Sequence, residues 1–162
     1  MHRMLKSLLC DIQGELFELS IEKGFASVKF IDAFMKSKCA AALDMDYNKL
    51  QWMDTEYIMD TLIDELGDKL VQGKQELKCV MSWAGHLYRN WHFITGESSK
   101  EISKQAPAEQ ILYGFLYYDQ IGDEATVEDI KERATKRSAR KKRTDVIKGD
   151  FTVDLIPAMR RR

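Results

Sequence analysis

The stretch Leu77–Ile94, LKCVMSWAGHLYRNWHFI, contains two of the three Trp and two of the three His residues of the chain. Apolar residues recur along it at helical spacing on two sides, and one of these sides also carries His86 and Asn90. A helix that is apolar on two sides is expected to be enclosed by neighbours. We therefore predict a central buried helix over residues 76–95, in which Gly85 marks a close approach to another backbone.

The segments on either side of this helix also have helical periodicity. Gly14 is unfavourable inside the first of them unless it permits close packing against another helix. Ser, Asp and Pro residues at their starts are suited to the caps and first turns of helices. The sequence therefore predicts an all-α fold, a compact domain of five to seven helices around the central one. The other main helices are expected to begin near Met4, Ser27, Asp54, Ser98 and Pro107.

The composition is that of a soluble globular domain. The chain has 162 residues, of which 44% are apolar and 31% charged, and these fractions exclude wholesale disorder. No apolar run reaches the roughly 18–20 residues that a bilayer span requires, and acidic residues occur too early for a secretory signal. We therefore expect a cytoplasmic protein that does not associate with membranes.

The three cysteines and the large apolar residues of one connection are also expected to be buried. Cys10, Cys39 and Cys79 are widely spaced within apolar stretches, which indicates reduced, buried thiols rather than disulfides or zinc ligands. The connection over residues 44–53 is rich in turn-forming Asp and Asn. Its large apolar side chains, which are expected to hold it against the core, are Tyr47, Leu50 and Trp52.

Charge divides the chain into two parts. Residues 131–162 contain twelve Lys and Arg and four Asp and Glu, so their net charge is +8. Residues 1–130 contain the remaining 13 basic and 22 acidic residues, so their net charge is −9. We therefore predict a helical domain over residues 1–133, followed by a basic linker and C-terminal docking tail over residues 134–162.

The tail has two dissimilar halves. Residues 131–143 include no large apolar residue, so this half is expected to be marginally helical and outside the core. Beyond it, apolar residues alternate from Phe151 to Leu155 as in a strand, and Pro157 then ends the pattern, so a short extended segment is expected. An apolar peptide beyond a polar linker is typical of a docking segment. The predicted partner-binding residues are Phe151, Val153, Leu155 and Ile156.

The basic run over residues 136–143 is a candidate nucleic-acid site. Six of its eight residues are cations, which is enough for salt-dependent affinity for a phosphate backbone such as that of DNA. No aromatic residue interrupts the run, so base stacking is not predicted. The same run also suits a solvated linker that screens the acidic domain. Its cations are Lys136, Arg137, Arg140, Lys141, Lys142 and Arg143.

The polar residues of the central helix have two interpretations. His86 shares a helix face with Asn90, and Arg89 shares one with His92. These side chains are either an active or anion-binding site, or buried polar groups with local hydrogen-bond partners, and the enclosed position of the helix favours the second. The sequence has no phosphate-binding glycine loop and no metal-ligand spacing. No catalytic residue, cofactor or metal site is therefore predicted, and an enzyme is not favoured.

The order Arg89, Asn90, Trp91, His92 resembles the motif of the HEPN-type RNases, which are all-α proteins with an Arg, a polar residue and a following His. The resemblance implies an RNase in which Arg89 and His92 act on a phosphodiester. The spacing departs from the motif, however, because in that family more residues separate the Arg from the His than the two found here. This RNase remains the less favoured alternative to the nucleic-acid-binding regulator and to a protein-binding module.

Two longer segments resemble a group of small bacterial proteins encoded beside compact toxin-like genes, including ADP-ribosyltransferase-like ones. These segments are YNKLQWMDTEYIMDTL over residues 47–62 and WAGHLYRNWHFITGESSKEISKQAPAE over residues 83–109. The likeness extends over roughly Leu5–Ile130 and does not include the basic tail. It implies an antitoxin or operon partner that binds a toxin-like protein directly, and it supplies no catalytic residues.

Overall fold

The computed structural model describes the backbone of residues 1–160 and the side chains of residues 1–148. Within these residues the chain forms nine α-helices, two short 3-10 helices and no strand, which confirms the all-α prediction. None of the described helices is both long and apolar enough to cross a lipid bilayer. The elements are α1 (Arg3–Glu22), α2 (Ser27–Met35), α3 (Lys38–Asp44), η1 (Lys49–Trp52), α4 (Thr55–Leu66), η2 (Gly67–Lys69), α5 (Lys78–Thr95), α6 (Ser99–Gln105), α7 (Ala108–Tyr113), α8 (Phe115–Ile121) and α9 (Asp123–Arg160).

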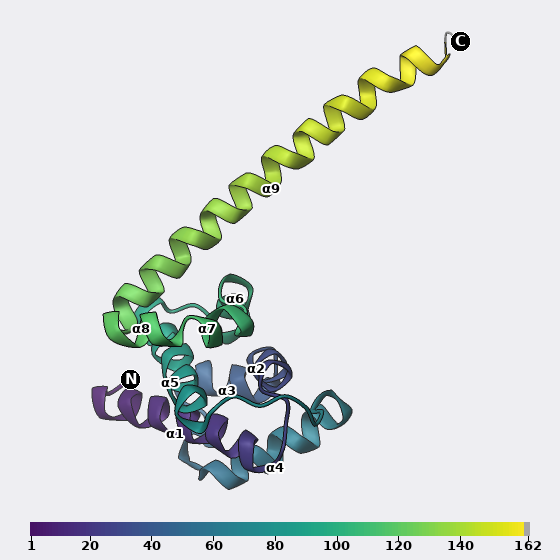
Figure 1. Cartoon of the computed structure of the whole chain (residues 1–162). Helices are drawn as coiled ribbons and strands as arrows, with labels where there is room; N and C mark the ends of the chain where they lie inside the picture. The colour runs from purple at the N-terminus through teal and green to yellow at the C-terminus, as the bar shows by residue number, and fades with distance from the viewer. Residues whose placement is uncertain (161–162) are drawn as a thin grey trace.

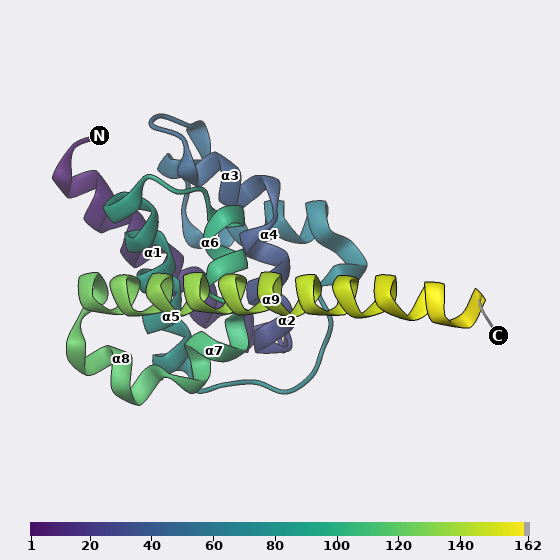
Figure 2. The same cartoon turned by 90° about the horizontal axis from the view of Figure 1, so that it is seen from above.

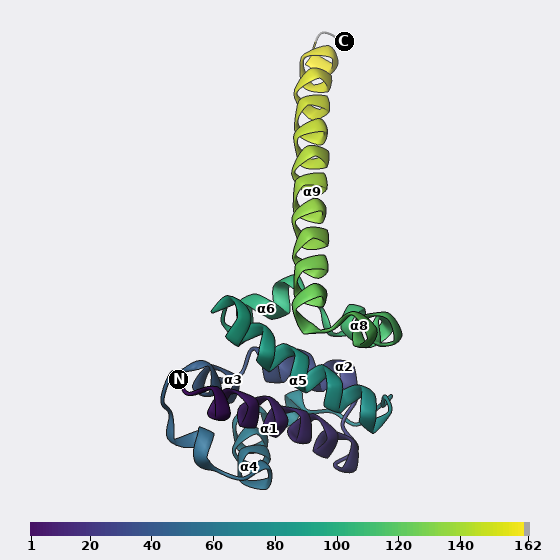
Figure 3. The ribbon, with the colours of Figure 1, turned by 90° about the vertical axis from the view of Figure 1, so that its left-hand side faces the viewer.

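In the body drawn in Figure 1, helices α1 and α5 make the most extensive contact of the fold, and Figure 3 shows them side by side. Two glycines permit this approach, as predicted. A Cβ atom at Gly85 would lie 2.5 Å from the backbone oxygen of Gln13, and one at Gly14 would lie 3.0 Å from that of Ser82. The two backbones therefore touch where the sequence has no side chain, and α5 is the central helix that its two-sided apolar pattern predicts.

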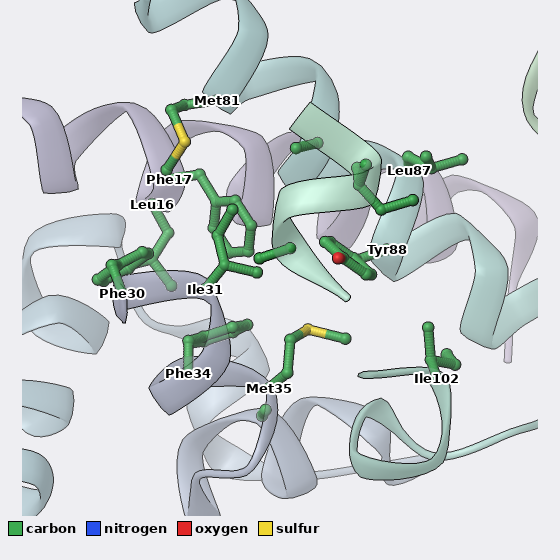
Figure 4. Close-up of a cluster of buried hydrophobic side chains, with 14 of the residues drawn as sticks. Leu16, Phe17, Phe30, Ile31, Phe34, Met35, Met81, Leu87, Tyr88 and Ile102 are labelled. Carbon is green, nitrogen blue, oxygen red and sulfur yellow. The ribbon is translucent and has the colours of Figure 1, made fainter. Parts of the chain in front are cut away.

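The hydrophobic core fills the space between α1, α2, α5 and α6 (Figure 4). The ring of Phe17 on α1 packs edge-on against Phe30 and Phe34 on α2, with ring centroids 5.5 and 5.3 Å apart. Tyr88 on α5 is also buried, and its hydroxyl donates a hydrogen bond to the backbone oxygen of Ala106 at 2.7 Å. The buried hydroxyl of Tyr88 thus has a hydrogen-bond partner, as buried polar groups require.

The connection between α3 and α4 is held differently from the way the sequence predicted. Of the three expected apolar contacts, only Leu50 is partly buried, whereas Tyr47 and Trp52 are 75% and 67% exposed. The buried Gln51 holds the connection instead, because its amide nitrogen donates to two backbone carbonyls at the end of α3, at 3.2 and 2.6 Å. Hydrogen bonds therefore fix this loop and leave its aromatic rings on the surface.

The cysteines follow the prediction in two cases out of three. All three are free thiols, and Cys10 and Cys39 are buried. Burial raises the pKa of each of these two thiols to about 12, which makes them unreactive. Cys79 is exposed instead, because it lies in the first turn of α5, before the buried stripe that starts at Val80.

The helix that the sequence predicts to begin near Pro107 is divided into α7 and α8 at Gly114. The ring of Tyr118 lies against this glycine, where a Cβ atom would be 2.5 Å from the ring. The second half packs on the central helix, because Phe115 meets Trp83 edge-on with ring centroids 5.2 Å apart. The division turns α8 toward the start of α9.

Helix α9 begins on the body formed by α1–α8 and then projects beyond it, standing between α6 and α8 (Figure 3). Its first turns are docked, since Thr126, Val127 and Ile130 are buried, whereas residues 135–148 are exposed. Figure 2 shows the helix crossing above the body and continuing past its edge. The predicted boundary between residues 133 and 134 therefore falls inside one helix, near the point where it leaves the body.

The structure corrects the prediction of an extended segment over Phe151–Leu155, because α9 continues as a helix through these residues. The backbone reason is that a helix pairs its own N–H and C=O groups, whereas an isolated strand leaves them unpaired. Residues 1–160 contain no strand with which an extended segment could pair. The side chains of the predicted partner-binding residues Phe151, Val153, Leu155 and Ile156 lie outside the described residues.

Candidate functional site

Arg89 is the centre of a buried polar cluster between α1, α3, α5 and α6. Its guanidinium is completely buried and donates from Nη1 to Asp44 Oδ1 at 2.7 Å and from Nε to Gln13 Oε1 at 2.8 Å. The second carboxylate oxygen of Asp44 accepts from the backbone N–H of Ser99 at 2.8 Å, and the Ser99 hydroxyl donates to Asp44 Oδ1 at 2.7 Å. One ion pair and its hydrogen bonds thus join four helices, and we call Gln13, Asp44, Arg89 and Ser99 the Arg89 cluster.

The burial of this cluster favours the interpretation of Arg89 as a buried polar group with hydrogen-bond partners over its interpretation as part of an active or anion-binding site. Burial lowers the pKa of Arg89 from its usual value, and the adjacent Asp44 carboxylate opposes that effect. Each nitrogen of this guanidinium donates a hydrogen bond within the fold, and none of the side chain is exposed to a ligand in solution. A phosphodiester could contact this guanidinium only if the helices separated, so the geometry gives Arg89 a structural role.

His92 lies beside the cluster and makes a local contact. Its Nδ1 lies 2.6 Å from the backbone oxygen of Glu97 and 3.8 Å from Asp44 Oδ1. The ring borders a hollow of about 310 Å³ that also meets Lys6 and Asp46. Because Arg89 does not line this hollow, the structure does not bring the two proposed RNase residues to one accessible surface.

His86 has a different environment from Arg89 because its side chain is 43% exposed. Its Nδ1 lies 3.5 Å from Asp123 Oδ2, at the start of α9, and its Nε2 lies 3.8 Å from Asp11 Oδ1. Asp123 also accepts from the side-chain amide of Asn90 at 2.7 Å. Hydrogen bonding to Asp123 raises the pKa of His86 above its usual value and lowers the pKa of Asp123. These contacts attach the first residue of α9 to the central helix.

Glu97 forms a second attachment of α9. Burial disfavours its charge, but hydrogen bonds from Lys131, Gln105 and Trp91 outweigh this effect and lower the pKa of Glu97 to about 2. Further along α9, the guanidinium of Arg137 donates to the backbone oxygen of Gln105 at 2.9 Å. The base of the helix is therefore held at a fixed place on the body.

The predicted nucleic-acid residues are all exposed on α9, but they do not share one face. Helical spacing places Arg140 and Arg143 in line with Arg133 and Lys136, whereas Lys141 and Lys142 point to other sides. We call the aligned residues Arg133, Lys136, Arg140 and Arg143 the basic stripe. Residues 131–148 contain nine basic and two acidic residues, so the described part of this segment is strongly positive.

A tyrosine-lined hollow lies at the foot of the basic stripe. Its volume is about 520 Å³, and it is bounded by Tyr113 and Tyr117 on one side and by Arg133, Lys136 and Arg137 on the other. Tyr113 is 96% exposed and Tyr117 57%. The basic run over residues 136–143 contains no aromatic residue, but the fold places Tyr113 and Tyr117 beside its first residues. We call this hollow the tyrosine pocket.

A patch of large apolar side chains lies on another part of the surface. Tyr47 and Trp52 join Met4 and Leu8 of α1 around a hollow of about 670 Å³, and Asp11 lies at its edge. Met4 is 76% exposed and Leu8 49%. Apolar side chains gathered in this way commonly mark a contact with another molecule. We call Met4, Leu8, Tyr47 and Trp52 the apolar patch.

Several of these features have no signal in the sequence alone. The partners of Arg89 come from α1, α3 and α6, far from it in the chain, and the two tyrosines meet the basic stripe only in space. Among the described residues, no group of His, Cys, Asp and Glu is arranged to hold a metal ion. Comparisons with protein-family models, curated proteins and solved structures find no match to this chain.

Proposed function

We propose that this protein is a protein–protein interaction module whose partner is a toxin-like protein that it neutralises by direct binding. The observation that carries the proposal is the apolar patch. Two aromatic and two aliphatic side chains on one surface are unfavourable in water, and Trp, Tyr and Met are enriched at protein interfaces. The buried Arg89 cluster adds support, because it accounts for the most unusual polar residue of the chain without catalysis.

Charge supports a partner with a basic surface. Residues 1–130, which comprise the body and the docked first turns of α9, have a net charge of −9. Asp11 borders the apolar patch. Enzymes that act on nucleotides or nucleic acids have basic substrate clefts, because the phosphates that they bind are anionic. An acidic body that covers such a cleft would neutralise a toxin of this class. The resemblance of residues 47–62 to proteins encoded beside toxin-like genes agrees with this partner, since Tyr47 and Trp52 lie within that segment.

The C-terminal end of α9 is proposed as a second contact with the same partner. The sequence there is apolar at Phe151, Val153, Leu155 and Ile156. Before it, Val146 and Ile147 are 63% and 66% exposed. A projecting helix of this kind can extend along a partner that the body holds. Two contacts on one partner raise the affinity more than either contact alone.

The experiment pairs this protein with the product of a toxin-like reading frame encoded next to it. Affinity is measured by isothermal titration calorimetry for the unaltered chain, for Trp52→Ala and for the chain ending at Arg143. Removal of a central aromatic contact costs about 2 kcal/mol or more, so Trp52→Ala should weaken binding about thirtyfold or more. The truncated chain should also bind more weakly while its body remains folded.

Tyr113→Ala is the matched control, because this tyrosine is also an exposed aromatic residue but lies outside the apolar patch. Its affinity for the partner should equal that of the unaltered chain. Equal affinity of the Trp52→Ala variant and the unaltered chain would contradict the assignment of the patch. Failure of the neighbouring product to bind at all would contradict the proposed function itself.

A further inference from the structure

We propose that the tyrosine pocket and the basic stripe form one binding site for single-stranded nucleic acid, with the phosphates along α9 and a base stacked on Tyr113 or Tyr117. This site is separate from the apolar patch proposed for the protein partner. No residue is common to the two surfaces. The proposal therefore stands or falls independently of the proposed function.

The two tyrosines supply the stacking surface. Tyr113, at the end of α7, is almost fully exposed, and Tyr117 follows one turn later on α8. An exposed aromatic ring can stack on any base, and each such stack contributes about 1–3 kcal/mol to binding. The pocket volume of about 520 Å³ lies within the range of small-ligand sites. It has room for a flat ring between the tyrosines and α9.

The basic stripe supplies the contacts with the backbone. Its cations recur at spacings of three and four residues from Arg133 to Arg143, so they extend about 15 Å along one face of the helix. A second hollow of about 530 Å³ follows the same face, and Lys136 borders both hollows. The stripe thus leads without interruption from the tyrosine pocket toward the projecting part of α9.

The stripe can exchange its present partners for phosphates. Arg133 pairs with Asp129 at 2.9 Å and Lys136 with Glu132 at 2.7 Å, but the cations of both pairs are at least 60% exposed. Exposed pairs of this kind contribute only about 0–1 kcal/mol. Within residues 1–148, no carboxylate pairs with Arg140 or Arg143. Arg137 has a different role, because it donates to Gln105 and Gln110 and so holds the stripe beside the tyrosines.

A single strand fits this surface better than a duplex. Bases of a duplex are stacked on one another, so their faces are not available to Tyr113 or Tyr117. The tyrosines would then add nothing to the phosphate contacts. An acidic protein would likewise use the cations and leave the aromatic rings unused. The juxtaposition of rings and cations is therefore the feature that selects an unpaired strand.

The test uses the full chain and a fluorescein-labelled oligothymidylate of about twelve nucleotides, with fluorescence anisotropy as the readout. Affinity should fall as salt rises, with a slope of log K against log salt of about −2 to −3 for three to four phosphate contacts. The double variant Tyr113→Ala and Tyr117→Ala should lose about tenfold or more in affinity with an unchanged slope. The double variant Arg140→Gln and Arg143→Gln should instead reduce the slope by about 0.7 per residue.

Tyr57→Ala is the control, because this half-exposed tyrosine lies on α4 and does not border the tyrosine pocket. It should bind the oligonucleotide like the unaltered chain. Two results would overturn the proposal. One is the absence of binding at about 50 mM salt, where phosphate contacts are strong. The other is that a duplex of the same length binds as tightly as the single strand and that the double tyrosine variant does not change the affinity.

Discussion

The arginines of this protein occupy two opposite environments. Arg89 is completely buried on α5 and donates hydrogen bonds to three residues, Gln13, Asp44 and Ser99, whereas Arg140 and Arg143 are exposed on the projecting part of α9. The buried guanidinium contributes by joining helices, because each of its three nitrogens donates a hydrogen bond inside the fold. An exposed one contributes little to stability and remains available to a partner. Burial, and not residue type, therefore separates structural from recognition residues here.

The largest effect is expected when the buried ion pair is broken. Asp44→Ala removes the carboxylate that faces Arg89 and leaves its charge buried without a counterion. Removal of one partner from such a pair costs about 3–5 kcal/mol, and we expect a loss of this size in urea denaturation. Asp46→Ala, at a nearby exposed carboxylate, is the control and should change the free energy of unfolding by less than about 0.5 kcal/mol. Equal stability of the two variants would contradict the buried role of Arg89.

The next effect concerns the backbone contact that encloses α5. In Gly85→Ala the new methyl group would lie 2.5 Å from the Gln13 oxygen, so α1 and α5 must move apart at a cost of about 1–3 kcal/mol. Gly14→Ala is the matched control, since its methyl group would lie 3.0 Å from the nearest backbone atom and alanine favours the helix by about 1 kcal/mol. Thermal denaturation should rank Gly85→Ala below Gly14→Ala. The reverse order would show that the helices do not touch at Gly85.

A smaller effect on the stability of the fold is expected from the protonation of His86, which is half-exposed and joins α5 to α9. Its folded pKa is raised above 6.5 by Asp123, so the protonated imidazole stabilises the fold fully below about pH 6.5. This contribution is lost as the pH rises through the folded pKa. NMR titration should give His86 a pKa above 6.5, and Asp123→Asn should lower it.

Asp11→Asn is the comparison for this titration, because Asp11 lies 3.8 Å from the ring and is the more exposed of the two carboxylates. It should lower the pKa of His86 less than Asp123→Asn does. A His86 pKa below 6.5 in the unaltered chain would contradict the contact between α5 and the start of α9.

The smallest effect is expected on the basic stripe. Arg140→Gln together with Arg143→Gln should change the free energy of unfolding by no more than about 0.5 kcal/mol, because both side chains are exposed. Urea denaturation measures this directly. A loss above about 1 kcal/mol would show that these arginines hold the structure in the same way as Arg89, and the contrast between the two environments would disappear.

The sequence predicted the features that depend on local pattern. The apolar periodicity of residues 76–95 identified the central helix, and Gly85 identified the close approach, because both properties are encoded by neighbouring residues. The prediction from sequence was wrong where hydrogen bonds or contacts outside the local apolar pattern decide the position of a side chain. Trp52 was expected in the core, but Gln51 fixes its loop through hydrogen bonds, so the ring lies on the apolar patch. Likewise, the tyrosine pocket depends on the division at Gly114 and on the docking of α9, and neither has a signature within the basic run.

Hydrogen exchange of the arginine Nε–H protons, observed by NMR in the unaltered chain, compares the two environments without any substitution. The Arg89 Nε–H donates to the buried Gln13, so its exchange requires the helices to open. It should therefore exchange about a thousandfold or more slowly than the Nε–H protons of Arg140 and Arg143, which corresponds to an opening free energy of about 4 kcal/mol or more. Exchange of Arg89 at the rate of the α9 arginines would contradict the structural role of the central helix.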